Sequence, residues 1–165
     1  VGSEMCIRDS IGIIHSPYKQ VKDMPIQGKF KPQVAAYIQL KDEYAPGLKS
    51  LEGFSHAVIL YYFHKSKKQE LLGRPFLEDK SHGIFAIRSP HRPNHIGLSV
   101  VKIQRIEKNT LHFTEVDVLD KTPVLDIKPY VRYFDMRENV TCGWVDKHFK
   151  NGKIPTRTIL KKTKK

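Results

Sequence analysis

Long hydrophobic runs and paired cysteines are both missing from this chain of 165 residues. No apolar stretch approaches the roughly eighteen residues that a membrane-spanning helix needs, so we do not expect a transmembrane protein. The only cysteines are Cys6 and Cys142. This number excludes a disulfide-rich domain and favours a reducing, cytoplasmic location. We expect Cys142 to be an ordinary packed thiol, because its sequence neighbours include no cation or base that would activate it.

The motifs that mark several common enzyme classes are also absent. The chain contains no GxGxxG after a strand, no GxxxxGK[ST], no HExxH, no paired CxxC and no GxSxG. The sequence therefore gives no motif support for a dinucleotide-binding protein, a nucleoside triphosphatase, a zinc protease or an α/β-hydrolase. His91 and His95 have the spacing of a helical metal pair, but Pro93 between them opposes a helix, and we predict no metal site.

The first ten residues, VGSEMCIRDS, have neither hydrophobic periodicity nor the pattern of a signal peptide. They read like the translation of a transposon-end sequencing adapter fused in frame to the coding sequence, although a natural flexible N-terminus is the alternative. Processing scars do not belong to a fold. We therefore predict a single domain over residues 11–146, of a size that can bury a hydrophobic core without disulfides or metal.

Positive charge is concentrated near the C-terminus. Residues 147–165 hold eight lysines and arginines and no acid, in a chain whose formal net charge is +12. A basic run of this kind is typically disordered and attracts polyanions such as nucleic acid, although a purely solubilising role is the alternative. We predict that residues 147–165 form such a basic tail.

Segments rich in β-branched and aromatic residues predict six strands with little helix. These segments are 11–16, 33–40, 56–64, 83–87, 96–107 and 110–120. The alternation in the last segment is imperfect and indicates a bulge, and Lys108-Asn109 before it reads as a hairpin turn. Pro46 and Gly53 delimit a short helix over residues 44–51. The pattern predicts a mainly β domain with short helices, either a closed barrel or a sandwich.

The loop RSPHRPNHIGLS, residues 88–99, combines stiffness with positive charge. Its two prolines fix φ at their positions and restrict the residues before them, so the loop is expected to be ordered before it binds anything. Arg88 and Arg92 have planar guanidinium groups suited to a carboxylate or phosphate. A plain solvated connection between strands is the alternative.

Three further stretches have polar residues in places where a small ligand can bind. In LDKTPVLDIKPY, Asp120 and Thr122 offer polar groups, whereas Asp126 and Lys128 form either an ion pair or part of a site. In DMPIQGK, Gln27-Gly28 lies in a loop whose backbone can approach a ligand closely. In FSHAVILYYFHKS, His64-Lys65 ends an otherwise apolar strand.

Four stretches, in order, resemble one known family. They are IGIIHSPYK, GFSHAVILYYFHKS, GIFAIRSPHRPNHIGLS and TPVLDIKPYVRYFD. Together they resemble the TsaA-like family, also called the YaeB or TrmO family, over about residues 11–144. The resemblance implies a β-barrel methyltransferase that uses S-adenosylmethionine, is distinct from the Rossmann-fold class and acts as a homodimer. Its implied substrate is N6-threonylcarbamoyladenosine beside the anticodon of transfer RNA, methylated on N6.

The resemblance also implies the residues that contact the cofactor. These are Gln27, Gly28, His64, Lys65, Arg88, Leu98, Asp120, Lys121, Thr122 and Pro123. Lys121 departs from the family, which usually has Asp-Gly-Thr-Pro at 120–123. If this position needs a positive φ, lysine costs on the order of 1 kcal/mol there.

The implied reaction suggests further roles. A urea-type N–H is a weak nucleophile, so a base should help; His91 and Asp126 are the candidates. Arg92, Lys19 and the basic tail are expected to contact phosphates of the anticodon loop, and Tyr18 or Tyr130 to stack on a base. Two alternatives remain: a methyltransferase of the same fold acting on another nucleotide or a small molecule, and an RNA-binding barrel without catalysis.

Overall fold

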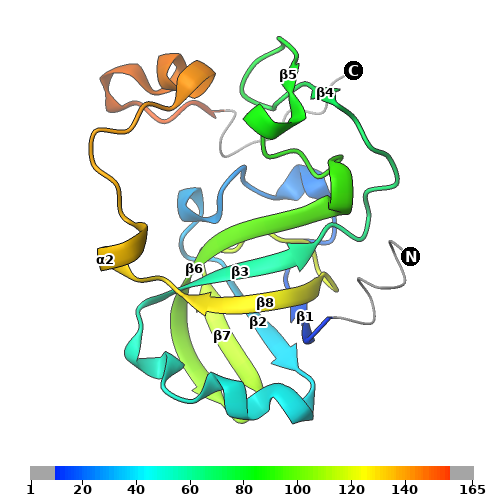
Figure 1. The fold of residues 1–165 in the computed structure, drawn as a ribbon, viewed down its shortest axis with the longest axis vertical. Helices are drawn as coiled ribbons and strands as arrows, with labels where there is room; N and C mark the ends of the chain where they lie inside the picture. The colour runs from blue at the N-terminus through cyan, green and yellow to red at the C-terminus, as the bar shows by residue number, and fades with distance from the viewer. Residues whose placement is uncertain (1–9, 157–165) are drawn as a thin grey trace.

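Six strands close into an antiparallel barrel (Figure 1) in the computed structural model, which describes residues 10–156. In their order around the barrel the strands are β1 (Gly12–His15), β2 (Ala35–Leu40), β7 (Thr110–Thr114), β6 (Ile96–Glu107), β3 (His56–Tyr62) and β8 (Pro123–Pro129). Every neighbouring pair is antiparallel. The predicted mainly β fold is confirmed, and of the two predicted architectures the closed barrel is the one observed.

Alternation of side chains along each strand fills the barrel. On β2, Ala36, Ile38 and Leu40 are buried whereas the residues between them face outward. Strands of period two place every second side chain on one face, so an alternating sequence gives one buried and one solvated face. The core residues with at most 1% of their surface exposed include Ile14, Ile38, Ile59, Val101, Leu111, Phe113 and Val124.

Most of the predicted strands are confirmed. The segments 11–16, 33–40 and 56–64 contain β1, β2 and β3, and β6 has the predicted bounds. The segment 110–120 forms a strand only as far as Thr114, because Glu115 has a left-handed backbone with φ of 64°. This residue is the point at which the hydrophobic alternation shifts, so the irregularity ends β7 instead of interrupting a longer strand.

One predicted strand is wrong and another was missed. In the segment 83–87, β5 (His82–Gly83) pairs with β4 (Leu72–Gly73), and a 3-10 turn, η5 (Ile84–Ala86), follows. Ile84 and Ile87 are buried while Phe85 is 79% exposed, a spacing of three that fits a turn and not a strand. Strand β8 was not predicted, since it begins and ends with proline.

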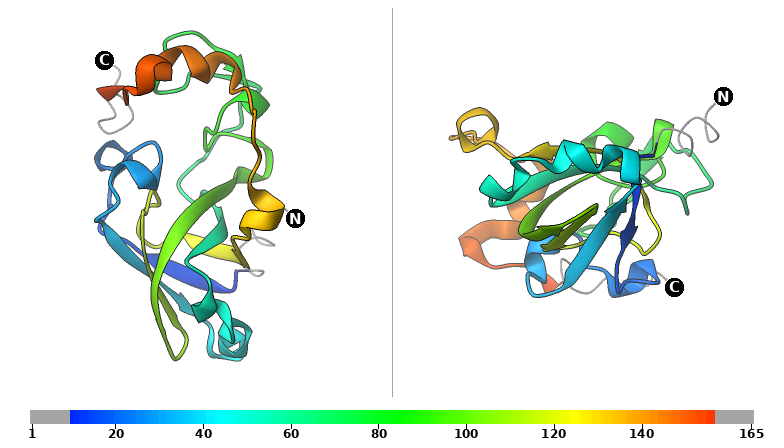
Figure 2. Two further views of the ribbon diagram at one scale, coloured as in Figure 1. Left: turned by 90° about the vertical axis from the view of Figure 1, so that its left-hand side faces the viewer. Right: turned by 90° about the horizontal axis from the view of Figure 1, so that it is seen from below.

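The expected helix over 44–51 is replaced by two 3-10 segments. These are η3 (Asp42–Leu48) and η4 (Leu51–Gly53), which cover the lower end of the barrel (Figure 2, right). Ser50 between them has φ of 71°, which no continuous helix accommodates. Their apolar side chains Leu48 and Leu51 are buried against the barrel core.

The opposite end of the barrel carries the long connections (Figure 1). They contain η1 (Val21–Asp23), η2 (Gly28–Phe30), the β4–β5 pair, η5 and η6 (Pro93–His95). Most of the site residues predicted from the sequence belong to these connections. Within residues 10–156, no helix has the length and apolar character needed to cross a bilayer.

The C-terminal segment differs in part from the predicted tail. After α2 (Arg132–Asp135), a 3-10 segment, η7 (Gly143–Gly152), lies over the upper connections (Figure 2, left). The Trp144 indole stacks on His82, with 4.8 Å between ring centroids, and its Nε1–H donates to the Ala86 carbonyl at 2.8 Å. Residues 147–152 are therefore ordered, and the remainder of the tail beyond 156 lies outside the described residues. Cys142 is exposed and not packed as predicted, because its segment runs along the surface.

Glu78 connects η7 to the β4–β5 connection. Its carboxylate is 9% exposed and accepts bonds from Lys147 at 2.7 Å, from His148 at 2.8 Å and from His82. Hydrogen bonds from Lys147, His82 and His148 lower the pKa of Glu78 to about 2. The charged carboxylate therefore stabilises this contact at neutral pH.

We expect acid to release η7 before it unfolds the barrel. Because the folded-state pKa of Glu78 is depressed, its contribution is complete above the ordinary glutamate pKa and is lost as the pH falls toward about 2. Glu78→Gln should show the same release at neutral pH, measured as faster proteolysis after Lys147 and Lys150. Glu70→Gln, which removes a surface pair with Lys68, is the control. Equal proteolysis rates in both variants would contradict this role of Glu78.

Candidate functional site

The loop 88–99 is braced by its own hydrogen bonds. Arg92 Nη1 donates to the carbonyl of Ile87 at 2.8 Å, and His95 Nδ1 lies 3.0 Å from the carbonyl of Pro90. Asn94 and His95 both have positive φ, which reverses the chain before β6 starts. The predicted stiffness therefore has a structural basis in addition to the prolines. The Arg92 Nη1 group is used inside the loop, and the contact of Arg92 with RNA phosphate stays a prediction.

Two predicted cofactor residues that are far apart in the sequence meet at the upper end of the barrel. Arg88 Nη1 donates to Gln27 Oε1 at 3.4 Å. Arg88 follows η5, whereas Gln27 precedes η2. The contact is long for a hydrogen bond and uses only one of the five guanidinium donors, so it leaves most of the binding capacity of Arg88 for another group.

A chain of three polar groups, two of them buried, lies beside this pair. Tyr61 and Ser99 share a hydrogen bond of 2.9 Å, and Ser99 Oγ donates to Asp117 Oδ1 at 2.5 Å. Ser99 is 2% exposed and Tyr61 4% exposed. The sequence prediction missed all three residues. Ser99 carried a usable signal, since it is a polar residue at an inward-facing position of β6, between Gly97 and Val101.

Gly28 brings the η2 segment against the chain that carries Asp117. A Cβ atom at Gly28 would lie 1.7 Å from the carbonyl oxygen of Glu115 and 2.9 Å from the nitrogen of Val116. The structure shows that this glycine lets the backbone approach the chain itself, while its approach to a ligand stays a prediction.

We call Gln27, Tyr61, Arg88, Ser99 and Asp117 the polar cluster. Burial, together with the charge of Asp117, raises the pKa of Tyr61, and the Arg88 charge opposes that shift. The positive Arg88 and the negative Asp117 thus act on the same phenol. Tyr61 remains neutral and acts as a hydrogen-bonding group between two opposite charges.

Tyr18 connects the polar cluster to the segment 120–123. Tyr18 is 7% exposed, and within the described part of the chain its buried hydroxyl has no hydrogen-bond partner. Burial and the nearby Asp117 raise the pKa of Tyr18. Its carbonyl accepts the Asp120 N–H at 2.8 Å. A buried hydroxyl without a partner costs free energy, which a ligand atom that bonds to it would recover. The stacking of Tyr18 on an RNA base stays a prediction.

His64 and Lys65 follow the end of β3, as the sequence predicted. His64 Nε2 is the second buried polar atom without a hydrogen-bond partner among residues 10–156. Burial, assisted by the adjacent Lys65 charge, lowers the pKa of His64. The imidazole is therefore neutral at pH 7.

The segment 120–123 packs against β1. Asp120 Oδ1 accepts the Ser16 N–H at 3.0 Å, and Lys19 Nζ donates to Asp120 Oδ2 at 2.5 Å. Burial disfavours the Asp120 charge, but these two bonds more than offset it and lower the pKa. Thr122 is buried and donates to the Leu119 carbonyl, whereas Pro123 pairs with Ile13 at the start of β8.

Lys121 has φ of 67°, which confirms that its position requires the left-handed region. A residue with a Cβ is strained there by about 1 kcal/mol, and glycine is not. We expect Lys121→Gly to have a free energy of unfolding about 0.5–1 kcal/mol higher than that of Lys121→Ala, since both lose the lysine side chain and only one keeps the strain. Chemical denaturation of the two variants measures this difference. A more stable alanine variant would show that the strain is absent.

Leu98 lies apart from the other predicted cofactor residues. It is 46% exposed on the outer wall of β6, between Ile96 at 47% and Val100 at 41%. A groove of about 470 Å³ borders Asp120 and Lys121, and neither Gln27, Arg88 nor Leu98 lines it. The structure therefore brings Gln27 into contact with Arg88, and the Tyr18 backbone bonds to Asp120. Leu98 lies on another face of the same chain.

The two candidate bases have different surroundings. His91 Nδ1 lies 2.7 Å from Ser66 Oγ, and burial together with the Lys68 charge lowers the pKa of His91. Asp126 pairs with Lys128 at 2.8 Å and lines a groove with η3 and η4, which cover the other end of the barrel. Asp126 thus lies in an ion pair at the other end of the barrel from the upper connections, and its role as a base stays a prediction.

The remaining predicted RNA contacts are exposed to different degrees. Lys19 is 68% exposed even though it bonds Asp120. Tyr130 is half-buried and meets His56 edge to face, with 6.3 Å between ring centroids. In the described part of the chain, no three His, Cys, Asp or Glu side chains come together in a way that suits a metal ion.

The fold and the site together define a class of protein: a small closed β-barrel with a polar site at one end, built from connections and not from a Rossmann crossover. The chain belongs to the family described as "tRNA-methyltransferase O N-terminal domain", which it matches over residues 13–136.

Relatives and solved structures agree with this membership. The chain is 47% identical over 144 residues to a probable S-adenosyl-L-methionine-binding protein of Pyrococcus abyssi, covering 87% of this chain and 78% of that one. It is 37% identical to the human tRNA (adenine(37)-N6)-methyltransferase, covering 68% of this chain and 26% of the human protein.

A crystal structure of TrmO superposes with a TM-score of 0.72 at 36% identity, covering 81% of this chain. A TrmO from Pseudomonas aeruginosa superposes with a TM-score of 0.70 at 34% identity, covering 82%. This chain spans only 61% and 60% of those two structures.

Proposed function

We propose that this protein transfers a methyl group from S-adenosylmethionine to N6 of N6-threonylcarbamoyladenosine beside the anticodon of transfer RNA. The observation that supports the cofactor most directly is the polar cluster, in which Arg88 and Asp117 lie around Tyr61. A cation and a carboxylate at one site complement the carboxylate and ammonium of an amino acid. S-adenosylmethionine has such an amino-acid end.

The groups without partners fit the same ligand. The buried hydroxyl of Tyr18 and the buried Nε2 of His64 each lack a bond within the described chain. Hydroxyls and ring nitrogens of a nucleoside are suitable partners for them. Gln27 and Arg88 would hold the amino-acid carboxylate, and Asp117 the ammonium group.

S-adenosylmethionine supplies a methyl group that is already activated by its sulfonium. The protein mainly has to align the acceptor nitrogen with this methyl group and accept the proton that the nitrogen loses. His91 suits the second task, because its lowered pKa keeps it neutral at pH 7. The hydrogen bond to Ser66 fixes the orientation of its ring.

The proposed substrate rests on the relatives and on charge. The human and mouse relatives are tRNA (adenine(37)-N6)-methyltransferases. The formal net charge of +12 favours association with a polyanion, and Lys19 is exposed near the site. A methyltransferase of this fold that acts on another nucleotide is the second candidate, since several relatives are named only for binding S-adenosylmethionine.

We further propose that the protein acts as a homodimer in the cytoplasm. Ile96, Leu98 and Val100 form an exposed apolar strip along β6, which a second copy would cover. In a dimer, Leu98 of one chain would approach the cofactor bound by the other, which accounts for its distance from Arg88 within one chain.

Two measurements test the proposal. Calorimetry should detect binding of S-adenosylmethionine, and the absence of heat at millimolar cofactor would remove both methyltransferase readings in favour of an RNA-binding barrel without catalysis. Incubation with labelled S-adenosylmethionine should methylate transfer RNA that has threonylcarbamoyl groups and leave transfer RNA that lacks them unchanged. Equal labelling of both would support the second candidate.

A further inference from the structure

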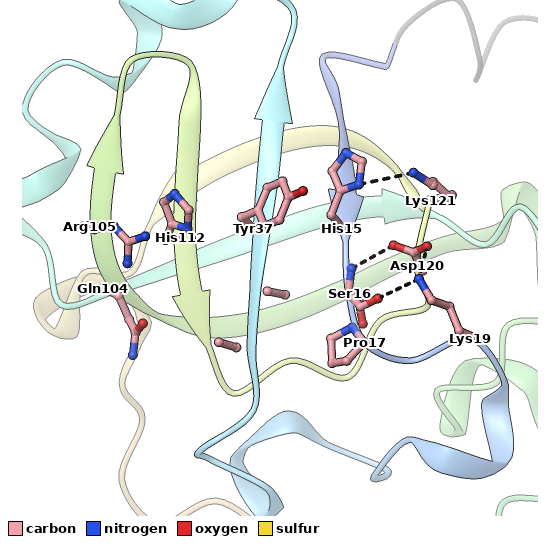
Figure 3. Close-up of a pocket in the computed structure, with 12 residues that line it drawn as sticks. His15, Ser16, Pro17, Lys19, Tyr37, Gln104, Arg105, His112, Asp120 and Lys121 are labelled. Atoms are coloured by element: carbon pink, nitrogen blue, oxygen red, sulfur yellow. Dashed lines mark hydrogen bonds and ion pairs between the residues drawn. The ribbon is translucent and has the colours of Figure 1, made fainter.

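A row of rings and cations crosses the outer wall of the barrel. His15 on β1 pairs with Tyr37 on β2, Tyr37 pairs with His112 on β7, and His112 pairs with Arg105 on β6. Figure 3 shows these side chains side by side, with Lys121 continuing the row beyond His15. Lys121 Nζ lies 3.4 Å from His15 Nδ1. Cross-strand register therefore aligns the three rings with Arg105, and the turn before β8 places Lys121 at the other end of the row.

The rings turn their edges outward. His15 and Tyr37 stack with 4.7 Å between centroids and 18° between planes, and Tyr37 and His112 are 5.6 Å apart. Rings stacked along the cross-strand direction cover each other's faces, so a ligand meets the phenol hydroxyl and the imidazole nitrogens. Tyr37 is 38% exposed. The row is thus a line of hydrogen-bonding groups more than a platform for stacking.

A groove of about 470 Å³ lies along this row. Ala35 is the next outward-facing residue of β2 after Tyr37, and its small side chain leaves the wall hollow there. Three cations, Lys19, Arg105 and Lys121, and one carboxylate, Asp120, line the groove. Lys19 pairs with Asp120, and Arg105 Nε pairs with Glu107 at 2.7 Å, which leaves the other guanidinium donors of Arg105 and the Lys121 ammonium for a ligand. The lining is therefore polar with exposed cations, which suits a phosphate-bearing ligand and not an apolar one.

The length of the row indicates which phosphate-bearing ligand it fits. Strands lie about 4.8 Å apart, so the row spans about 14 Å from β1 to β6. A single phosphate cannot contact the cations at both ends, whereas a nucleic-acid strand places phosphates and ribose hydroxyls along the whole length. The mixture of phosphate-binding cations and edge-on polar rings is typical of RNA recognition.

The groove also adjoins the proposed cofactor site. Asp120 and Lys121 belong both to the groove and to the segment 120–123. Aromatic pairs across strands often serve only to stabilise a sheet. Here the row has cations at both ends and leads to the segment that the cofactor is expected to contact, which sheet stability does not require.

We infer that the groove formed by His15, Tyr37, His112 and Arg105 binds the RNA strand next to the nucleotide being methylated. This inference rests on the proposed function, since it assigns a path to the transfer RNA. Arg105 and Lys121 contact phosphates at the two ends, and Tyr37 donates its hydroxyl to a phosphate or ribose oxygen between them.

Fluorescence anisotropy with an unmodified transfer RNA transcript tests the inference on the full chain. Arg105→Glu should weaken binding roughly tenfold and make the dependence of log K on log salt shallower by about 0.7, the value for one phosphate contact on a single strand. Tyr37→Phe, which keeps the stack and removes the hydroxyl, should weaken binding severalfold. Lys49→Glu changes the charge by the same amount near η3 and is the control, expected to bind like the wild type.

Calorimetry with S-adenosylmethionine separates this inference from the proposed function. If Arg105→Glu binds the cofactor normally and the transcript weakly, the groove is the RNA path. If Arg105→Glu and Lys49→Glu weaken RNA binding equally, the attraction is only to net charge and the inference is overturned. If the wild type binds RNA through Arg105 but no cofactor, the proposed function fails while the groove stands. If the wild type binds an acidic protein and does not bind the RNA transcript, the inference is also overturned.

Discussion

Gly28→Ala is expected to lower the free energy of unfolding by about 3 kcal/mol or more. The new Cβ would lie 1.7 Å from the Glu115 carbonyl oxygen and 2.2 Å from its carbon. Both are backbone atoms, which cannot rotate away as a flexible side chain can, and overpacking against them is among the most destabilising changes known. The η2 segment must move, and Gln27 then leaves Arg88. Chemical denaturation measures the loss of stability, and calorimetry measures the loss of S-adenosylmethionine binding.

Gly53→Ala is the matched control for this substitution. A Cβ at Gly53 meets nothing within 4 Å, and its φ is not in the left-handed region. The change should therefore be neutral or slightly stabilising, since alanine restricts the unfolded chain more than glycine does. If both variants unfold alike and bind the cofactor alike, the close packing at Gly28 is not what forms the site.

The sequence predicts the barrel well wherever local alternation determines the strand. β6 has the predicted bounds because its inward positions alternate with outward ones over its first seven residues. β8 was missed because pairing makes it a strand: it joins β1 to β3 and so closes the barrel. Neither its prolines nor its charged residues reveal that contact, which depends on segments far away in the sequence.

The candidate site was predictable only in part, for a similar reason. Gln27 and Arg88 were singled out from their loops, their cofactor role came from resemblance to a family, and the structure places the two side chains in contact. The chain of Tyr61, Ser99 and Asp117 comes from three different segments and exists only once β3, β6 and the residues after β7 meet. The left-handed Glu115 makes this possible, since it turns the chain after β7 toward Ser99. One sequence does not reveal where such a turn leads.

Buried polar groups distinguish the two ends of the barrel. The lower end is closed by Leu48 and Leu51, which pack into the core. At the upper end, Tyr61 and Ser99 lie in the barrel core, where they are hydrogen bonded to each other and Ser99 is bonded to Asp117. A fully satisfied polar chain of this kind fixes the positions of its members, so the ligand meets a surface that is ordered in advance.

Arg88→Ala is expected to weaken S-adenosylmethionine binding about tenfold to a hundredfold. A hydrogen bond to a charged group contributes about 1.5–3 kcal/mol, and the exposed position of Arg88 places the effect within the lower part of this range. Arg88→Lys should recover part of the loss, because the charge is kept while the planar pair of donors is not. Stability should change little, since the bond between Arg88 and Gln27 is long and exposed.

Arg74→Ala removes an exposed arginine from the β4–β5 connection and serves as the control for net charge. Calorimetry on the three variants decides the point: if Arg88→Ala binds the cofactor as tightly as Arg74→Ala does, the amino-acid end of the ligand is held elsewhere, and the pairing of Arg88 with Asp117 around Tyr61 is structural only.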